Sequence, residues 1–179
     1  PSDQWLESGH DYVIDGLWGR LGFQETVGET LISGATNGLA AVEDPRNGNT
    51  FLYAGAANGG LYLRIYDIAK SKWRNQWQWL TKPGSFYEGS QGIAIIEPSD
   101  DGQYLAVGQG NSSNYAGVSA PSKGVQVGRI LSDGRLSWLP LSEASQAKLN
   151  GLDVRSLVWE GDLLRGTAWD PRTESGSRF

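Results

Sequence analysis

The stretch GLAAVEDPRNGNTFLYAGAANGG, residues 38–60, decides the fold of this chain, because it recurs about 53 residues later. The second copy, GIAIIEPSDDGQYLAVGQGN, begins at Gly92. Each copy reads as a short apolar strand, an acidic turn containing Pro or Gly, a second apolar strand ending in Gly, and a loop of small residues. The repeat therefore predicts paired short strands.

The similarity extends beyond these two strands. The segments that follow are LYLRIYDIAKSKW, residues 61–73, and GVQVGRILSDGRLSW, residues 124–138. Both read as a third strand, a polar turn and a Trp that opens a fourth strand. A weaker third copy, VRSLVWEGDLLRGTAWDP, begins at Val154. Repeats of this length built from four short strands are typical of β-propeller blades.

We therefore expect an all-β chain, a β-propeller fragment of about two and a half four-stranded antiparallel blades. The third copy ends at Phe179, where its third strand would begin, so we expect a truncated blade there. One helix is predicted at 141–149, with Ser142 as its cap. The expected divisions are residues 1–33, an N-terminal segment from the preceding or ring-closing blade; 34–90, blade 1; 91–151, blade 2 with a loop insertion at 110–123; and 152–179, the first half of blade 3.

Composition excludes several classes of function. The net charge of −5 argues against a nucleic-acid partner, since binding to phosphates needs clustered Lys and Arg. The chain contains no Cys, which excludes disulfides, thiolate zinc sites and thiol catalysis. No apolar run is long enough for a membrane span. Each Gly-rich stretch lies between strands, so no phosphate-binding loop is predicted. We expect no cofactor and no metal.

Two segments carry a resemblance to a known family. AVEDPRNGNTFLYAGAANGGLY resembles the repeats of bacterial BNR, or Asp-box, propellers. ILSDGRLSW is similar to a degenerate Asp box, in which Arg135 replaces the second glycine. The resemblance implies a structural turn, in which an Asp accepts backbone N–H groups, a Gly adopts positive φ and a Trp packs between blades. The residues of this turn are Ser132, Asp133, Gly134, Ser137 and Trp138.

The resemblance spans families of different activity, namely sialidase-like, sortilin-like and xyloglucanase-like propellers. It implies an extracellular or cell-surface location and further blades in the same protein. We expect a non-catalytic scaffold, part of a larger secreted or surface protein, whose loop face binds carbohydrate or protein. The alternative is a glycoside hydrolase fragment with most catalytic residues in missing blades. No Arg opens the first blade in the family's arginine-containing strand motif. Ala57 and Asn58 stand where xyloglucanase-type members carry an acidic residue, so no catalytic residue is nominated.

Loop parity indicates where a ligand would bind. Successive connections between antiparallel strands alternate between two faces, and the longer loops share one of them. Long irregular loops are more often functional than short turns. Tyr87 and Tyr115 suit either ligand binding or the covering of blade edges. The candidate ligand-binding residues on this face are Asn58, Phe86, Tyr87, Glu88, Asn111, Asn114 and Tyr115.

Overall fold

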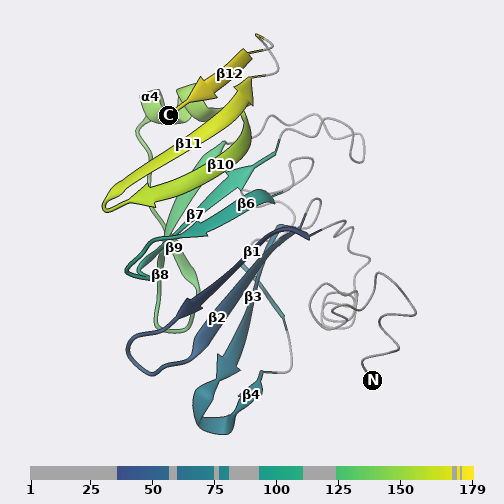
Figure 1. Cartoon of the computed structure of the whole chain (residues 1–179), viewed down its shortest axis with the longest axis vertical. Coiled ribbons are helices and arrows are strands. Elements are labelled where there is room, and N and C mark those ends of the chain that lie inside the picture. The colour runs from purple at the N-terminus through teal and green to yellow at the C-terminus, as the bar shows by residue number, and fades with distance from the viewer. Residues whose placement is uncertain are drawn as a thin grey trace, which may run out of the picture.

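The computed structural model describes residues 36–56, 60–74, 77–80, 93–110, 124–170, 173 and 175–179. Most regular structure in these ranges is β, arranged in three antiparallel sheets. Figure 1 shows the sheets following one another in chain order along the long axis of the molecule. The all-β fold class predicted from the sequence is confirmed.

The first sheet contains five strands. Four of them pair in chain order, and the fifth pairs with the third. A 3-10 helix, η1 (Ile68–Lys70), connects the third strand to the fourth. The strands are β1 (Thr36–Glu43), β2 (Thr50–Ala56), β3 (Gly60–Asp67), β4 (Lys72–Trp73) and β5 (Gln78–Trp79).

The second and third sheets also pair in chain order. The second consists of β6 (Ile93–Pro98), β7 (Tyr104–Gln109), β8 (Val125–Ile130) and β9 (Leu136–Trp138). The third consists of β10 (Asp153–Glu160), β11 (Leu163–Asp170) and β12 (Ser175–Arg178). An α-helix, α4 (Glu143–Leu149), lies between these sheets in sequence.

Helix α4 forms where the sequence predicted it. The Ser142 side chain accepts a hydrogen bond from the Ser145 N–H at 3.2 Å, which satisfies one of the free donors of the first turn. Glu143 in the first turn and Lys148 in the last complement the helix dipole. The predicted helix and its cap are confirmed.

The third sheet differs from the prediction. The sequence predicted only two strands before the chain ends, whereas β12 forms a third and pairs with β11 from Asp170↔Ser175 to Thr167↔Arg178. The expectation of a blade cut before its third strand was wrong. Strand pairing depends on backbone groups, so a polar segment without apolar alternation can still pair with the free edge of β11.

The first two sheets pack face to face through an apolar core. One face of the first sheet carries Phe51, Tyr53 and Leu63, all at most 1% exposed. Ile93 and Leu105 of the second sheet, each 0% exposed, belong to the same cluster. Burying these large side chains between sheets is the main favourable contribution to such packing.

The opposite face of the second sheet packs against the third. Ala106 and Val125 form a second cluster with Val154 and Leu157 of β10. Trp159 packs at its margin and donates its indole N–H to the Glu97 carbonyl at 3.1 Å. The second sheet is therefore covered on both faces, which explains why most of β7 is buried.

The first strand of every sheet carries an irregularity at the same place. Register shifts lie between Thr36 and Gly38, between Ile93 and Ile95, and between Val154 and Ser156. Each shift inserts one extra residue opposite the second strand, as a β-bulge does. The pairs that directly follow the shifts are Gly38↔Gly55, Ile95↔Gly108 and Ser156↔Thr167.

Two of these equivalent positions are glycines for a steric reason. A Cβ on Gly55 would lie 2.3 Å from Ile93 Cγ2, and one on Gly108 would lie 2.7 Å from Val154 Cγ1. Because each glycine has no side chain, the first strand of the next sheet packs directly against its backbone. The equivalent residue of the third sheet, Thr167, is exposed. The third sheet therefore has no glycine at the position where the first two sheets receive the next strand.

Polar contacts join the sheets at the end where the short turns lie. Tyr53 Oη donates to the Gly134 carbonyl at 2.7 Å in a buried contact. Arg46 Nη2 donates to the Leu131 carbonyl at 3.2 Å, and its Nε donates to Asp44 Oδ1 at 2.6 Å. The turn of the first sheet is thereby connected to the turn that precedes β9.

Asp44 makes this connection sensitive to acid. Its side chain is buried, which by itself raises the pKa, but hydrogen bonds from Arg46 and the Arg46 charge bring the pKa below its ordinary value of 3.8. Because the pKa of Asp44 is lower in the folded than in the unfolded state, its ionised side chain stabilises the fold at pH values above the unfolded-state pKa. This stabilisation is lost as the pH falls through the folded-state pKa.

We expect Asp44→Asn to lower the free energy of unfolding at pH 7 by about 1–3 kcal/mol, because Arg46 loses its charged acceptor. The difference from the wild type should shrink as the pH falls below 4. Urea titrations at pH 7 and pH 3 measure both quantities. Asp133→Asn, at a carboxylate that is 57% exposed, is the control and should change stability by less than about 0.5 kcal/mol. An Asp44→Asn effect no larger than this control would contradict the assignment.

Candidate ligand-binding site

The connections divide the sheets into two ends. The turns that join β1 to β2, β3 to β4, β6 to β7, β8 to β9 and β10 to β11 lie at one end, which we call the short-turn end. The strands β2, β7 and β11 finish at the opposite end, where β3, β8 and β12 begin. We call this the long-loop end. It is the end where the sequence places its candidate ligand-binding residues.

The candidate residues themselves are not part of the described structure. The residues outside the described ranges are Asn58, Phe86, Tyr87, Glu88, Asn111, Asn114 and Tyr115. Their grouping on one face therefore stays a prediction, which rests on the strand directions alone.

An amide network supports the described part of the long-loop end. Gln126 Nε2 donates to Gln146 Oε1 at 2.9 Å, and Gln146 Nε2 donates to Asn150 Oδ1 at 2.9 Å. Gly124 lies against the end of α4, since a Cβ there would be 2.4 Å from the Leu149 carbonyl oxygen. These contacts attach α4 to the second sheet beside β8.

The Asp-box-like turn lies at the short-turn end. Asp133 Oδ1 accepts the Arg135 N–H at 3.0 Å, and Gly134 has φ of 78°. Trp138, half-buried, packs against the cluster between the first two sheets. Ser132 and Ser137 are exposed. These contacts account for the turn as a structural element.

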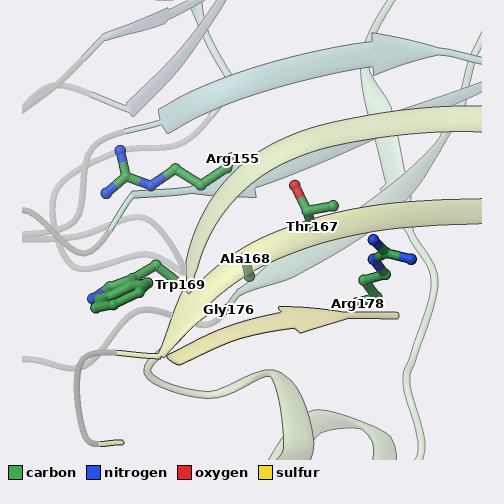
Figure 2. A pocket seen from close by; sticks show the side chains of 6 residues that line it. All are labelled: Arg155, Thr167, Ala168, Trp169, Gly176 and Arg178. Atoms are coloured by element: carbon green, nitrogen blue, oxygen red, sulfur yellow. The ribbon is translucent and has the colours of Figure 1, made fainter. Parts of the chain in front are cut away.

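A depression of about 530 Å³ opens on the outer face of the third sheet. Its volume lies in the range of small-molecule sites. Figure 2 shows the side chains of Arg155 and Trp169 extending toward one end of it, Arg178 at the other, and Thr167 between them. The lining residues are Arg155, Thr167, Ala168, Trp169, Gly176 and Arg178.

Backbone geometry builds this depression. The bulge in β10 leaves Arg155 and Ser156 exposed in succession, although neighbouring strand residues normally point to opposite faces. In β11, alternation exposes Thr167 and Trp169, the latter 40% exposed. Gly176 pairs with Trp169, and a Cβ there would meet nothing within 4 Å. The space beside the indole therefore remains open.

The charge of the depression is positive. Arg155 forms an ion pair with Asp153, whose side chain is 15% exposed and holds the guanidinium in place. Among the described residues, Arg178 forms no ion pair with a carboxylate. No Asp or Glu belongs to the lining residues. Thr167, one of the lining residues, shares a hydrogen bond of 2.7 Å with the Ser156 hydroxyl.

This arrangement suits binding rather than chemistry. Two guanidiniums can each offer paired N–H donors to a carboxylate, sulfate or phosphate. The half-exposed indole offers an apolar surface beside them. The lining residues include no carboxyl, imidazole or thiol that could transfer a proton or attack a substrate.

The sequence prediction missed this depression. Arg155 and Trp169 stand in a strand pattern that looks like an ordinary pair of strands. The available signal was a departure from the repeat, since Thr167 occupies the position that is glycine in the first two copies. The bulge that aligns the three positions is visible only in the structure.

Comparisons with known proteins add no family assignment. No family model matches the chain, and no curated protein matches it either. In the described ranges, no helix is both long and apolar enough to cross a membrane.

Proposed function

We propose that the chain is part of an Asp-box β-propeller that acts as a non-catalytic scaffold and binds carbohydrate at its long-loop end. Three sheets in chain order, packed face to face, support the propeller architecture. The three bulges at equivalent positions support a true structural repeat. Each sheet corresponds to one blade, and the short-turn end corresponds to the face with the Asp-box turn.

One observation carries the binding role: the exposed indole of Trp169 lies at the same end of the sheets as the long loops. Trp169 and Gly176 flank the connection between β11 and β12, which lies at that end. An exposed indole beside hydrogen-bond donors suits a sugar ring, whose C–H faces are apolar and whose rim is polar. The opposite end offers short turns held by their own hydrogen bonds.

The hydrolase alternative gains no support from the depression. Glycoside hydrolysis needs two carboxyl groups about 5 to 9.5 Å apart on either side of the scissile bond. The depression has none in its lining. A secreted or surface location remains part of the proposal and follows from the family resemblance.

A glycan array tests the proposal, with neutral, uronic-acid-containing and sulfated oligosaccharides as probes. We expect at least one class to bind without release of reducing sugars. Tyr87→Ala and Tyr115→Ala should weaken this binding if the long loops contribute to it, and Tyr66→Ala in β3 is the control. Release of sugar would identify a hydrolase. A protein captured while every glycan fails to bind would replace carbohydrate recognition with protein recognition.

A further inference from the structure

The short-turn end carries two exposed regions of opposite charge. The first follows β3, and we call its residues Lys70, Lys72 and Arg74 the basic pole. The side chains of Lys70 and Arg74 are 67% and 50% exposed, and both pair with Asp67, whose side chain is only 13% exposed. Lys72 is also exposed. The cations therefore face solvent, while the carboxylate that two of them share is largely covered.

The second region, which we call the acidic pole, consists of Glu43, Asp100 and Asp101. Glu43 ends β1, and the two aspartates lie in the turn between β6 and β7; all three are exposed. A Cβ on Gly102 would lie 3.6 Å from the Glu43 carbonyl oxygen, so this turn lies beside the end of β1. Burial and the Asp100 charge raise the pKa of Glu97 in β6, which agrees with a negative potential here.

The turn between β1 and β2 joins the two poles into one surface. Asn49 Oδ1 accepts the Ile68 N–H at 3.0 Å, and a Cβ on Gly48 would lie 3.7 Å from Ile68 Cγ2. Arg46 of the same turn donates to the Leu131 carbonyl. Figure 1 shows this turn between η1 and the turn that joins β6 to β7. The basic pole, the turn and the acidic pole therefore follow one another across the short-turn end.

Aliphatic side chains are exposed on the same surface. Ile68 is 50% exposed, and Leu131 is 41% exposed. Interfaces between proteins commonly combine apolar groups with surrounding charges in this way. Neighbouring sheets of this chain pack against each other through their faces, which leaves the turns at the short-turn end uncovered. A further sheet packed in the same manner would leave this surface open as well.

We propose that the short-turn end is the contact surface between two copies of this chain, related by a twofold axis that places the basic pole of each copy against the acidic pole of the other. A twofold axis makes the same contact twice, so one self-complementary surface is sufficient. The two long-loop ends would then face away from each other. This inference goes beyond the proposed carbohydrate binding and does not depend on it.

The pattern of charge selects a second copy over other partners. An anionic membrane or a nucleic acid would be repelled by the acidic pole and by the net charge of −5. A protein surface of a single charge sign would be repelled by one of the two poles. A surface that carries both signs in the complementary order matches both poles, and the chain itself supplies such a surface.

Sedimentation velocity of the full chain over a range of concentrations tests the inference. Exposed charge pairs contribute more to specificity than to affinity, so we expect a weak dimer with a dissociation constant of about 0.1 mM. Lys70→Glu with Lys72→Glu makes both poles acidic, and Glu43→Lys with Asp100→Lys makes both poles basic. Each double variant alone should raise the dissociation constant at least about ten-fold, because like charges then face each other.

An equimolar mixture of the two double variants is the decisive sample. In a mixed dimer both contacts again join opposite charges, so association should return to within about three-fold of the wild type. Ile68→Ser should weaken the wild-type dimer about five-fold through the loss of apolar contact. The matched control is Leu139→Ser after β9, where the side chain is 39% exposed, and it should change the dissociation constant by less than about two-fold. Melting temperatures establish that each variant is folded.

Three results would overturn the inference. The wild type would sediment as a monomer at about 1 mM, well above the expected dissociation constant. The two folded double variants would remain monomeric when mixed, or neither would differ from the wild type alone. Val158→Lys, at an exposed residue on the outer face of the third sheet, would dissociate the dimer and assign the contact to that face instead.

Discussion

Gly55→Val and Gly108→Val are each expected to lower the free energy of unfolding by about 3 kcal/mol or more. Neither glycine adopts a positive φ, so the cost is steric. A Cβ on Gly55 would lie 2.7 Å from Ile93 Cβ, and one on Gly108 would lie 3.0 Å from Val154 Cβ. The added side chain would separate sheets that now pack closely, and both cores would lose apolar contacts.

Urea denaturation followed by tryptophan fluorescence measures these changes. Thr167→Val is the matched control, because Thr167 is the equivalent residue of the third sheet and is exposed. It should change stability by less than about 0.5 kcal/mol. Valine also favours strands, so poor local propensity cannot explain a loss at Gly55 or Gly108. Equal stabilities for all three variants would mean that the sheets do not pack through these positions.

Gly134→Ala is expected to cost about 2–4 kcal/mol, for two reasons that act together. The residue has φ of 78°, where a side chain is strained by about 1–2 kcal/mol. A Cβ there would also lie 2.9 Å from both Leu63 Cδ2 and Phe51 Cδ1, which belong to the buried core. The turn would be displaced from the first sheet, and the Tyr53 hydrogen bond to the Gly134 carbonyl would lengthen.

Gly161→Ala separates the two causes. Gly161 has φ of 60°, but a Cβ there would meet nothing within 4 Å. This variant should therefore lose only the backbone contribution, about 1 kcal/mol. Thermal and urea unfolding of both variants give the comparison. A Gly134→Ala loss no greater than that of Gly161→Ala would show that the turn does not pack against the first sheet.

The sequence predicted the strands well because they are short apolar runs bounded by polar turns and by glycine-containing loops. The first strands of the three copies, expected to begin at Gly38, Gly92 and Val154, correspond to β1, β6 and β10, each of which begins within two residues of the expected position. Helix α4 was predictable from Ser142 and the residues that follow it. These features are local, and local chemistry determines them.

What the sequence did not predict depends on contacts between distant segments. Strand β12 is polar and short, and it forms because β11 offers free backbone groups. The depression depends on a bulge at Arg155, and nothing in the surrounding residues distinguishes that bulge from a regular strand. The candidate loop residues were inferred from the alternation of successive connections between the two ends of the sheets. This alternation predicts that the long loops share one end, but it predicts no contact between their side chains.

The order of the sheets is the central claim, and a cysteine cross-link between the second and third sheets tests it most directly. The chain contains no Cys, so the pair Gly108→Cys with Val154→Cys would report without background. A Cβ on Gly108 would lie 3.0 Å from Val154 Cβ, close to the roughly 3.5–4.5 Å that a disulfide requires. Val154→Cys also removes the methyl group that the new side chain at position 108 would meet.

Mass spectrometry after mild oxidation should find the intramolecular disulfide in the folded protein and far less of it in urea. The comparison pair is Gly108→Cys with Val158→Cys, since Val158 lies on the outer face of the third sheet and is 49% exposed. It should remain reduced under the same conditions. A cross-link that forms equally in both pairs, or in neither while both double variants remain folded, would contradict the face-to-face packing of the second and third sheets.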